Sequence, residues 1–174
     1  MLVVSGPPGA GRTTLAHALA TALTRPLACR DELKERLVAA GASPADQLDP
    51  LANEAFFRTL GEEPAAGHSP VAEAAFQDRF WRPGLAPLAD LAAIRAVRCV
   101  VDAAVARTRI TDRAASDPRR AARADAELPD RVARGERPIQ PGAPIALDVP
   151  SLVVDSTRGW IPGLPEIVSF ARLV

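Results

Sequence analysis

Residues 5–14 read SGPPGAGRTT and match a phosphate-binding P-loop of the Walker A type in every position but one. The exception is Arg12, which stands where the motif has lysine. The glycines bracket a loop whose backbone amides can surround phosphate oxygens, and the following helix points the positive end of its dipole at the same anion. We therefore expect a nucleotide site made of Gly6, Pro7, Pro8, Gly9, Ala10, Gly11, Arg12, Thr13 and Thr14, with the Thr13 hydroxyl on Mg²⁺.

Arg12 keeps the positive charge of a lysine but replaces a compact ammonium with a larger planar fork. Binding of a di- or triphosphate can survive this change because the backbone does most of the cradling. Contact with the transferring phosphoryl group can be lost, and one such donor is worth on the order of a hundredfold in rate. Lys34 is the sole lysine in the chain, so a compositional bias toward arginine can also supply Arg12. The sequence therefore leaves a catalytic role of Arg12 open.

Hydrophobic spacing predicts strands that alternate with helices. The strands are expected at 2–5, 27–29, 71–76, 96–101 and 151–155, and the helices at 12–23, 31–38, 49–60, 85–94, 102–114 and 165–173. Asp31, Asp49 and Asp102 are placed to cap helices, and Pro83-Gly84 is expected to form a turn. Such alternation implies an α/β fold with a five-stranded parallel sheet and helices on both faces, formed by one domain over residues 1–174.

Ligands of such sheets lie at the carboxyl ends of the strands. Besides the loop, this rule collects Arg30 and Asp31 after the second strand, Glu73 near the end of the third, and residues 155–158 after the last. Residues 107–137 hold nine arginines and six acidic residues, as expected of a lid that closes over a triphosphate. Arg113 is the favoured lid residue, followed by Arg109. Surface ion pairs are the alternative for both arginines.

The loop, the step Cys29-Arg30-Asp31-Glu32-Leu33-Lys34, residues 71–76 and residues 109–125 together resemble P-loop kinases of the nucleotide-kinase-like type. Such proteins are often labelled AAA-family ATPase or ATP-binding protein in actinomycete-like sequences, and their relatives include polynucleotide 5′-kinases, chloramphenicol phosphotransferase and zeta toxins. The resemblance implies ATP and Mg²⁺ as cofactors. It also implies Asp31 as the residue that orients or deprotonates an acceptor hydroxyl, and Arg30 and Lys34 as acceptor contacts. Glu73 would act through water on Mg²⁺ or touch the acceptor, with a surface glutamate as the alternative. Thr157 and Arg158 would lie beside the nucleotide base.

Composition narrows the possible partners. The 21 basic and 21 acidic residues balance and aromatic residues make up 4% of the chain, which disfavours nucleic-acid binding. Cys29 and Cys99 do not show the paired spacing of a disulfide framework. The apolar stretches are too short for a membrane span. Together these features predict a cytoplasmic protein. The first hypothesis is a kinase or phosphotransferase acting on a small-molecule hydroxyl. The second is a nucleotide-binding protein whose catalysis is weakened by Arg12, and the third is a polynucleotide 5′-kinase. The acceptor and the oligomeric state stay open.

Overall fold

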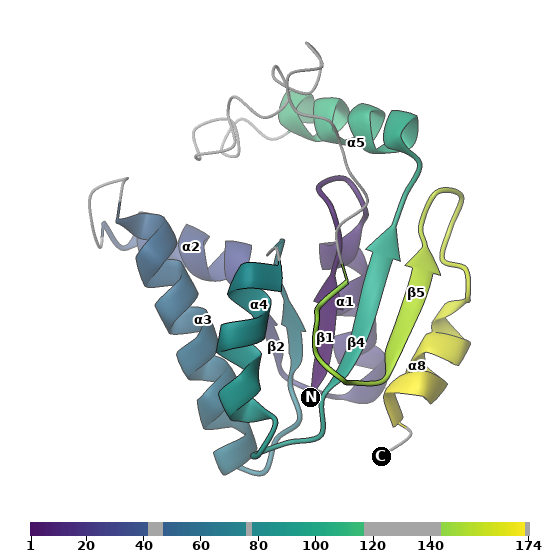
Figure 1. Cartoon of the computed structure of the whole chain (residues 1–174). Helices are drawn as coiled ribbons and strands as arrows, with labels where there is room; N and C mark the ends of the chain where they lie inside the picture. Colours follow the sequence, from purple (N-terminus) through teal and green to yellow (C-terminus); the bar gives the residue numbers. More distant parts are fainter. Residues whose placement is uncertain (42–46, 76–77, 117–143, 173–174) are drawn as a thin grey trace.

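The computed structural model describes residues 1–41, 47–75, 78–116 and 144–172. Five strands form one parallel sheet in the order β2-β3-β1-β4-β5 (Figure 1). They are β1 (Leu2–Ser5), β2 (Leu27–Cys29), β3 (Val71–Glu73), β4 (Arg95–Val100) and β5 (Ser151–Asp155). The expected five-stranded parallel sheet is confirmed. The first strand lies in its centre, between β3 and β4.

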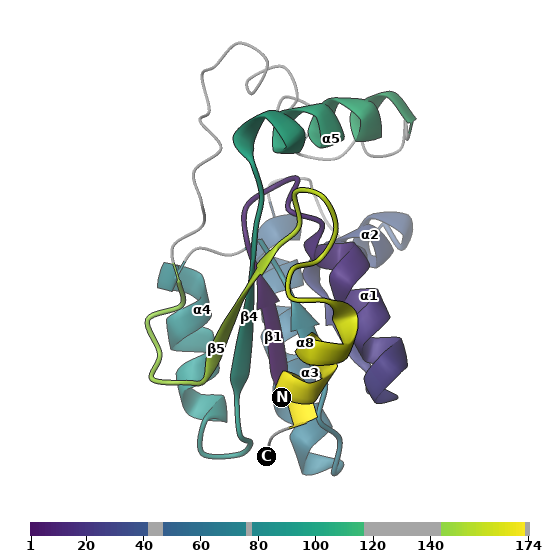
Figure 2. The same cartoon turned by 90° about the vertical axis from the view of Figure 1, so that its right-hand side faces the viewer.

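Helices cover both faces of this sheet, as the alternating pattern predicted. The helical segments are α1 (Arg12–Leu23), α2 (Arg30–Ala39), α3 (Leu48–Ala65), α4 (Asp78–Leu85), the 3₁₀ turn η1 (Ala86–Leu88), α5 (Ala103–Ser116) and α8 (Leu164–Arg172). Helices α1 and α8 pack on one face, while α3 and α4 pack on the other. Figure 2 shows α4 and the α1–α8 pair on opposite sides of the strands.

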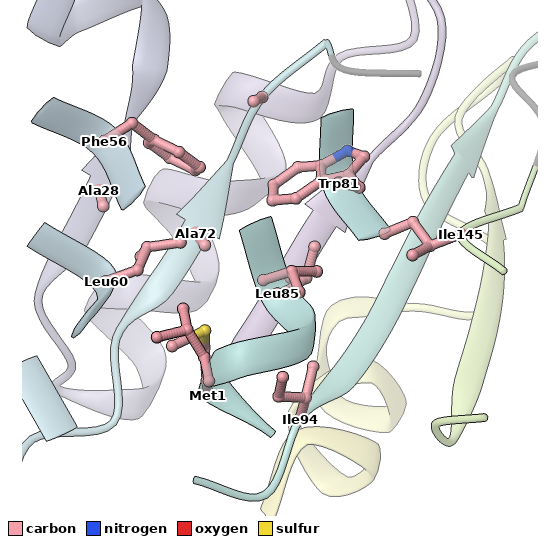
Figure 3. Close-up of a cluster of buried hydrophobic side chains, with 12 residues drawn as sticks. Met1, Ala28, Phe56, Leu60, Ala72, Trp81, Leu85, Ile94 and Ile145 are labelled. Atoms are coloured by element: carbon pink, nitrogen blue, oxygen red, sulfur yellow. The ribbon is translucent and has the colours of Figure 1, made fainter. Parts of the chain in front are cut away.

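The alternation of side chains along β1 divides the core into two buried clusters. Leu2 and Val4 face α1 and α8, whereas Val3 faces α3 and α4. In the second cluster, aromatic side chains fill the space between the two helices and the sheet (Figure 3). Phe56 and Trp81 meet edge to face with ring centroids 5.7 Å apart. The central strand is therefore held from both sides, which fixes the loop that follows it.

Two of the three expected helix caps are wrong. Asp31 and Asp49 lie inside the first turns of α2 and α3, whose preceding residues give no side-chain cap. Their carboxylates accept hydrogen bonds from Arg30 instead of from helix amides. Asp102 is confirmed as the cap of α5, because its Oδ1 accepts from the amides of Ala104 and Val105 at 2.8 and 3.2 Å. Asp49 thus forms tertiary ion pairs with Arg30 and Lys34 of α2, whereas Asp31 pairs with its chain neighbour Arg30.

The expected helix over 85–94 and the expected turn at 83–84 are also wrong. Helix α4 covers Asp78–Leu85 and contains both Pro83 and Gly84. A Cβ atom on Gly84 would lie 2.2 Å from Cε1 of Phe57, so the glycine permits close packing of α4 on α3. Helix α3 likewise continues through Gly61 and Pro64 to Ala65 rather than ending at Gly61. Packing overrides the local preference of these residues for turns.

The carboxyl ends of the strands gather the candidate residues at one edge of the sheet. The loop after β1, the start of α2, Glu73, the start of α5 and the loop after β5 all lie there, and α5 runs above them (Figure 1). Of the expected lid over 107–137, only the part within α5 belongs to the described residues. No helix among the described segments is long and apolar enough to span a membrane.

Candidate functional site

The glycine loop, residues 6–11, connects the buried strand β1 to helix α1. A turn within it is closed by the amide of Ala10, which donates to the carbonyl of Pro7 at 3.2 Å. Gly11 precedes α1 in a left-handed conformation with φ +68°. Among the described residues no side chain caps this helix. The first amides of α1 therefore point toward the edge of the sheet with their donors open to an anion.

Two glycines of this loop are required by their surroundings. A Cβ on Gly6 would lie 2.5 Å from the carbonyl oxygen of Cys99 in β4. A Cβ on Gly9, whose φ is +78°, would lie 2.7 Å from the carbonyl oxygen of Ala106 in α5. Any side chain at either position would push the loop away from its neighbours. The loop is thus pressed between β4 and α5, and its path depends on both.

The side chain of Arg12 turns inward and is only 9% exposed. Its Nε donates to Oε1 of Glu73 at 2.9 Å, and its Nη1 donates to the carbonyl of Gly6. Glu73 is fully buried at the end of β3. Arg12 therefore ties the end of the glycine loop to its beginning and to a neighbouring strand. Glu73 therefore lies in the interior and not on the surface.

The second carboxylate oxygen of Glu73 faces two other elements. The Cys29 thiol at the end of β2 donates to Oε2 at 2.9 Å, and the hydroxyl of Thr13 lies 3.4 Å from the same oxygen. Oxygen ligands of this kind suit Mg²⁺, which usually takes one or two protein oxygens beside phosphates. The Thr13 hydroxyl, which lies beside Oε2 of Glu73, fits such an ion. Among the described residues no group of three or more His, Cys, Asp or Glu side chains could hold a metal by itself.

Both cysteines lie in this interior as unbonded thiols. Burial, together with the nearby Glu73 carboxylate, raises the pKa of the Cys29 thiol. Burial also raises the pKa of Cys99 to about 12, although the Arg12 charge opposes this. Both side chains are therefore protonated at neutral pH, and Cys29 acts as a hydrogen-bond donor. Both cysteines are thus small core residues.

Helices α2 and α3 meet through a polar cluster at the same edge. Arg30 and Lys34, one turn apart on α2, both hold the carboxylate of Asp49, with Lys34 Nζ at 2.7 Å from Oδ1. Arg30 also donates from Nε to Oδ1 of Asn53 at 3.0 Å. Burial alone would raise the pKa of Asp49, but the contacts with Lys34 and Arg30 outweigh it, so the pKa is lowered. Two largely buried cations thus converge on one half-exposed carboxylate.

Asp31 lies beside this cluster in the first turn of α2. Its Oδ1 accepts from Nη1 of Arg30 at 3.3 Å, and its side chain is 49% exposed. The carboxylate therefore keeps a solvent-facing surface on which an acceptor hydroxyl could bind. This arrangement is compatible with the expected role of Asp31, and it adds Arg30 as the side chain that orients the carboxylate.

Arg109 of α5 connects the glycine loop with the loop after β5. Its Nη1 donates to the Gly9 carbonyl and to the Ser156 hydroxyl, both at 3.3 Å. Its Nη2 donates to the carbonyls of Ser156 and Thr157 at 2.6 and 3.3 Å. The buried Ser156 hydroxyl in turn donates to the carbonyl of Ala10 at 2.9 Å. Arg109 thus contacts backbone oxygens of both loops.

The other residues expected at the nucleotide are Thr157 and Arg158 after β5 and Arg113 in α5. The Thr157 hydroxyl accepts from the amide of Asp102 at 3.0 Å, and its amide donates to Asp155 at 2.7 Å. This bonding lowers the pKa of Asp155. Arg158 and Arg113 are both exposed, the first after β5 and the second in the last turn of α5. Arg107 also lies exposed on α5, and the six lid arginines after Arg113 lie outside the described residues.

Sequence reasoning missed several members of the site. Asp49 was assigned to a helix cap, Asn53 carried no expected role, and Ser156 was expected only as part of the segment 155–158 after the last strand. The spacing of Asp49 and Asn53, four residues apart on one helix face, matches that of Arg30 and Lys34. That match is the one signal that could have paired the two helices. Ser156 offers no such signal, because its partners come from the glycine loop and from β4.

Comparison with known proteins identifies the family of this chain. The model of the AAA domain family (AAA_33) matches residues 1–138. The chain therefore belongs to this family. No curated protein matches the chain.

Solved structures share the fold over almost the whole chain. A "putative kinase" from Chloroflexus aurantiacus is 28% identical with a TM-score of 0.80, and the match covers 98% of this chain and 95% of that one. A sugar kinase from Janibacter sp. HTCC2649 is 18% identical with a TM-score of 0.58 over 98% and 90% of the two chains. A gluconokinase from Sinorhizobium meliloti 1021 is 18% identical with a TM-score of 0.55 over 98% and 87%. The fold is thus that of a P-loop kinase-like protein.

Proposed function

We propose that this member of the AAA domain family is an ATP-dependent kinase or phosphotransferase that moves the γ-phosphoryl group to a hydroxyl of a small molecule. The amides of the glycine loop and of the first turn of α1 hold the phosphates. Asp31 orients or deprotonates the acceptor hydroxyl, and Arg30 and Lys34 bind the acceptor. Mg²⁺, held by the Thr13 hydroxyl, would neutralise charge on the phosphates.

The observation that carries this proposal is the set of contacts around Glu73. One of its oxygens meets Arg12 from the start of α1, and the other meets both Thr13 and Cys29. Cys29 directly precedes Arg30 and Asp31 at the start of α2. One buried carboxylate therefore joins the phosphate side and the acceptor side. This supports a reaction between a phosphoryl donor on the loop and an acceptor held by α2.

The experiment that tests the proposal follows ATP consumption with Mg²⁺ over a panel of neutral sugars, sugar acids and oligonucleotides with a free 5′-hydroxyl. We expect turnover above the water background for a small hydroxyl compound. Turnover on the oligonucleotides alone would instead support a polynucleotide 5′-kinase. If calorimetric titration detects no binding of MgATP, the nucleotide site itself is contradicted.

Asp31→Asn tests the assigned base. We expect kcat to fall by about a hundredfold or more, because a positioned general base contributes on that order to the rate. The affinity for MgATP should stay within about twofold, since the neutral side chain leaves the phosphate amides untouched. Glu54→Gln, a change at an exposed acid of α3, is the matched control and should alter neither quantity. An unchanged kcat in Asp31→Asn would remove the base assignment.

The position of Arg12 favours a second candidate function, a nucleotide-binding protein with weak transfer activity. Its guanidinium is engaged by Glu73 and Gly6 instead of projecting from the loop. A missing transition-state donor would lower the rate by about a hundredfold or more. Comparing the native protein with Arg12→Lys separates the candidates. A large gain of activity in the lysine variant alone would support the second one.

A further inference from the structure

We propose that Arg12 and Glu73 form a buried brace that fixes the shape of the glycine loop, and that the guanidinium stays in this brace when a nucleotide binds. Arg12 is then a positioning residue, and the phosphates are held by backbone amides. The inference rests on the proposed function only where it concerns the nucleotide. The contacts that form the brace are present in the protein without a nucleotide.

The brace closes the glycine loop from the inside. Arg12 begins α1, yet it reaches back to the carbonyl of Gly6 at the other end of the loop. Its Nε meets Glu73 Oε1 at 2.9 Å, so the loop is also anchored to β3. Gly6 in turn lies against Cys99 of β4. The two strands that flank β1 thus determine the path of the loop, one through Glu73 and the other through contact with Gly6.

Charge burial keeps the guanidinium in place. Glu73 is 0% exposed, and Arg12 is the cation that pairs with it in the described ion pairs. Among the described residues, the Cys29 thiol and the Thr13 hydroxyl are the other side-chain donors to Glu73. A guanidinium that moved out to a phosphate would therefore leave this buried carboxylate without its cation. Leaving a buried charge unpaired is strongly unfavourable. A contact between Arg12 and a phosphate would therefore have to outweigh the cost of leaving the Glu73 carboxylate unpaired.

Arginine suits this brace better than lysine. The planar guanidinium carries donors in a fixed fork, so Nε and Nη1 can bond to two acceptors at once. Here these acceptors are a carboxylate and a carbonyl on different elements. An ammonium is a single point of charge on a flexible stem and cannot reproduce this fork. The departure from lysine at position 12 therefore has a structural consequence of its own.

A double-mutant cycle without nucleotide tests the brace. The variants are Arg12→Gln, Glu73→Gln and the combination of both, compared with the native protein by thermal unfolding. Each single change should lower the melting temperature by about 10 °C, because each leaves a buried partner unpaired. The double variant should lose clearly less than the sum of the two single changes. The proposal would be overturned if the two decreases in melting temperature were additive, or if the single variants had the melting temperature of the native protein.

Arg12→Lys keeps the proposal testable if the neutral variants do not fold. It preserves the charge but not the fork, so it should fold and melt a few degrees below the native protein. A melting temperature equal to or above the native value would overturn the brace. Arg58→Gln and Glu62→Gln form the matched control, since this exposed pair on α3 has its charged atoms 3.8 Å apart. Their changes should stay within about 2 °C.

Calorimetric binding of MgATP tests the second half of the proposal. The affinity of the double variant should stay within about tenfold of the native value, because backbone amides do the binding. A loss of more than about tenfold would overturn the second half of the proposal. If the native protein binds no MgATP, the proposed function fails, while the melting cycle still decides the brace.

Discussion

Arg109 donates a hydrogen bond of 2.6 Å from Nη2 to the main-chain carbonyl of Ser156. The same guanidinium reaches the carbonyl of Gly9 at 3.3 Å. Helix α5 is therefore tied at once to the loop after β5 and to the glycine loop. Arg109 was expected to belong to a lid over the triphosphate, but its backbone partners lie in the glycine loop and in the loop after β5. Its removal should loosen both loops together.

Replacing Arg109 with Gln should weaken binding of MgADP and MgATP alike, by about tenfold, because lost bonds to a charged donor leave several carbonyls without a partner. Calorimetry with both nucleotides measures this. Arg107→Gln, an exposed position on the same helix, is the control and should leave both affinities unchanged. A loss confined to MgATP would instead indicate contact with the third phosphate, as a lid residue would make.

Gly9→Ala should destabilise the protein more than Gly11→Ala. Both glycines have positive φ, but a Cβ on Gly9 would meet Ala106 whereas one on Gly11 meets nothing within 4 Å. The change at Gly11 therefore carries only backbone strain of about 1 kcal/mol. The change at Gly9 adds a clash with the backbone of α5, for a total of about 2–4 kcal/mol. Chemical denaturation of the two variants compares them, and equal losses would contradict the close approach of α5.

The Asp49 carboxylate should stabilise the protein fully above about pH 4 and lose this contribution gradually at lower pH. Its pKa is lowered from 3.8 by Lys34 and Arg30. A carboxyl with a lowered folded pKa contributes stability above its unfolded pKa and loses it as the pH falls through the folded value. Asp49→Asn should therefore have a lower melting temperature than the native protein at pH 6 and the same melting temperature near pH 2. Because the side chain is half exposed, we expect a difference of no more than about 1 kcal/mol.

The two thiols should resist modification in the folded protein. Cys29 and Cys99 are buried and have raised pKa values, so little thiolate forms at pH 8. A chromogenic disulfide reagent should find no fast-reacting thiol in the native state and both thiols in denaturant. The pKa of each thiol is higher in the folded than in the unfolded protein. The free energy of unfolding should therefore fall as the pH rises above the ordinary thiol value of 9.0. A fast native reaction would contradict the interior around Glu73.

Local sequence determined the elements around the site. The spacing of apolar residues located five strands, and the glycine pattern located the loop between β1 and α1, because both depend on residues that are close along the chain. The cap at Asp102 was predictable for the same reason. Helix α4 was not, because Pro83 and Gly84 indicate a turn until Phe57 is packed against the glycine.

Only the tertiary structure decided what the charged side chains bind. Arg12 meets Glu73 across 61 positions of the chain, and Arg109 meets Gly9 across 100. Such pairs depend on which strands are neighbours and on which side chains are buried, and neither follows from local spacing. The sequence alone determined that a phosphate-binding loop of this shape can form. The sheet order determined that its arginine points into the interior, because that order brings the buried carboxylate of β3 beside β1.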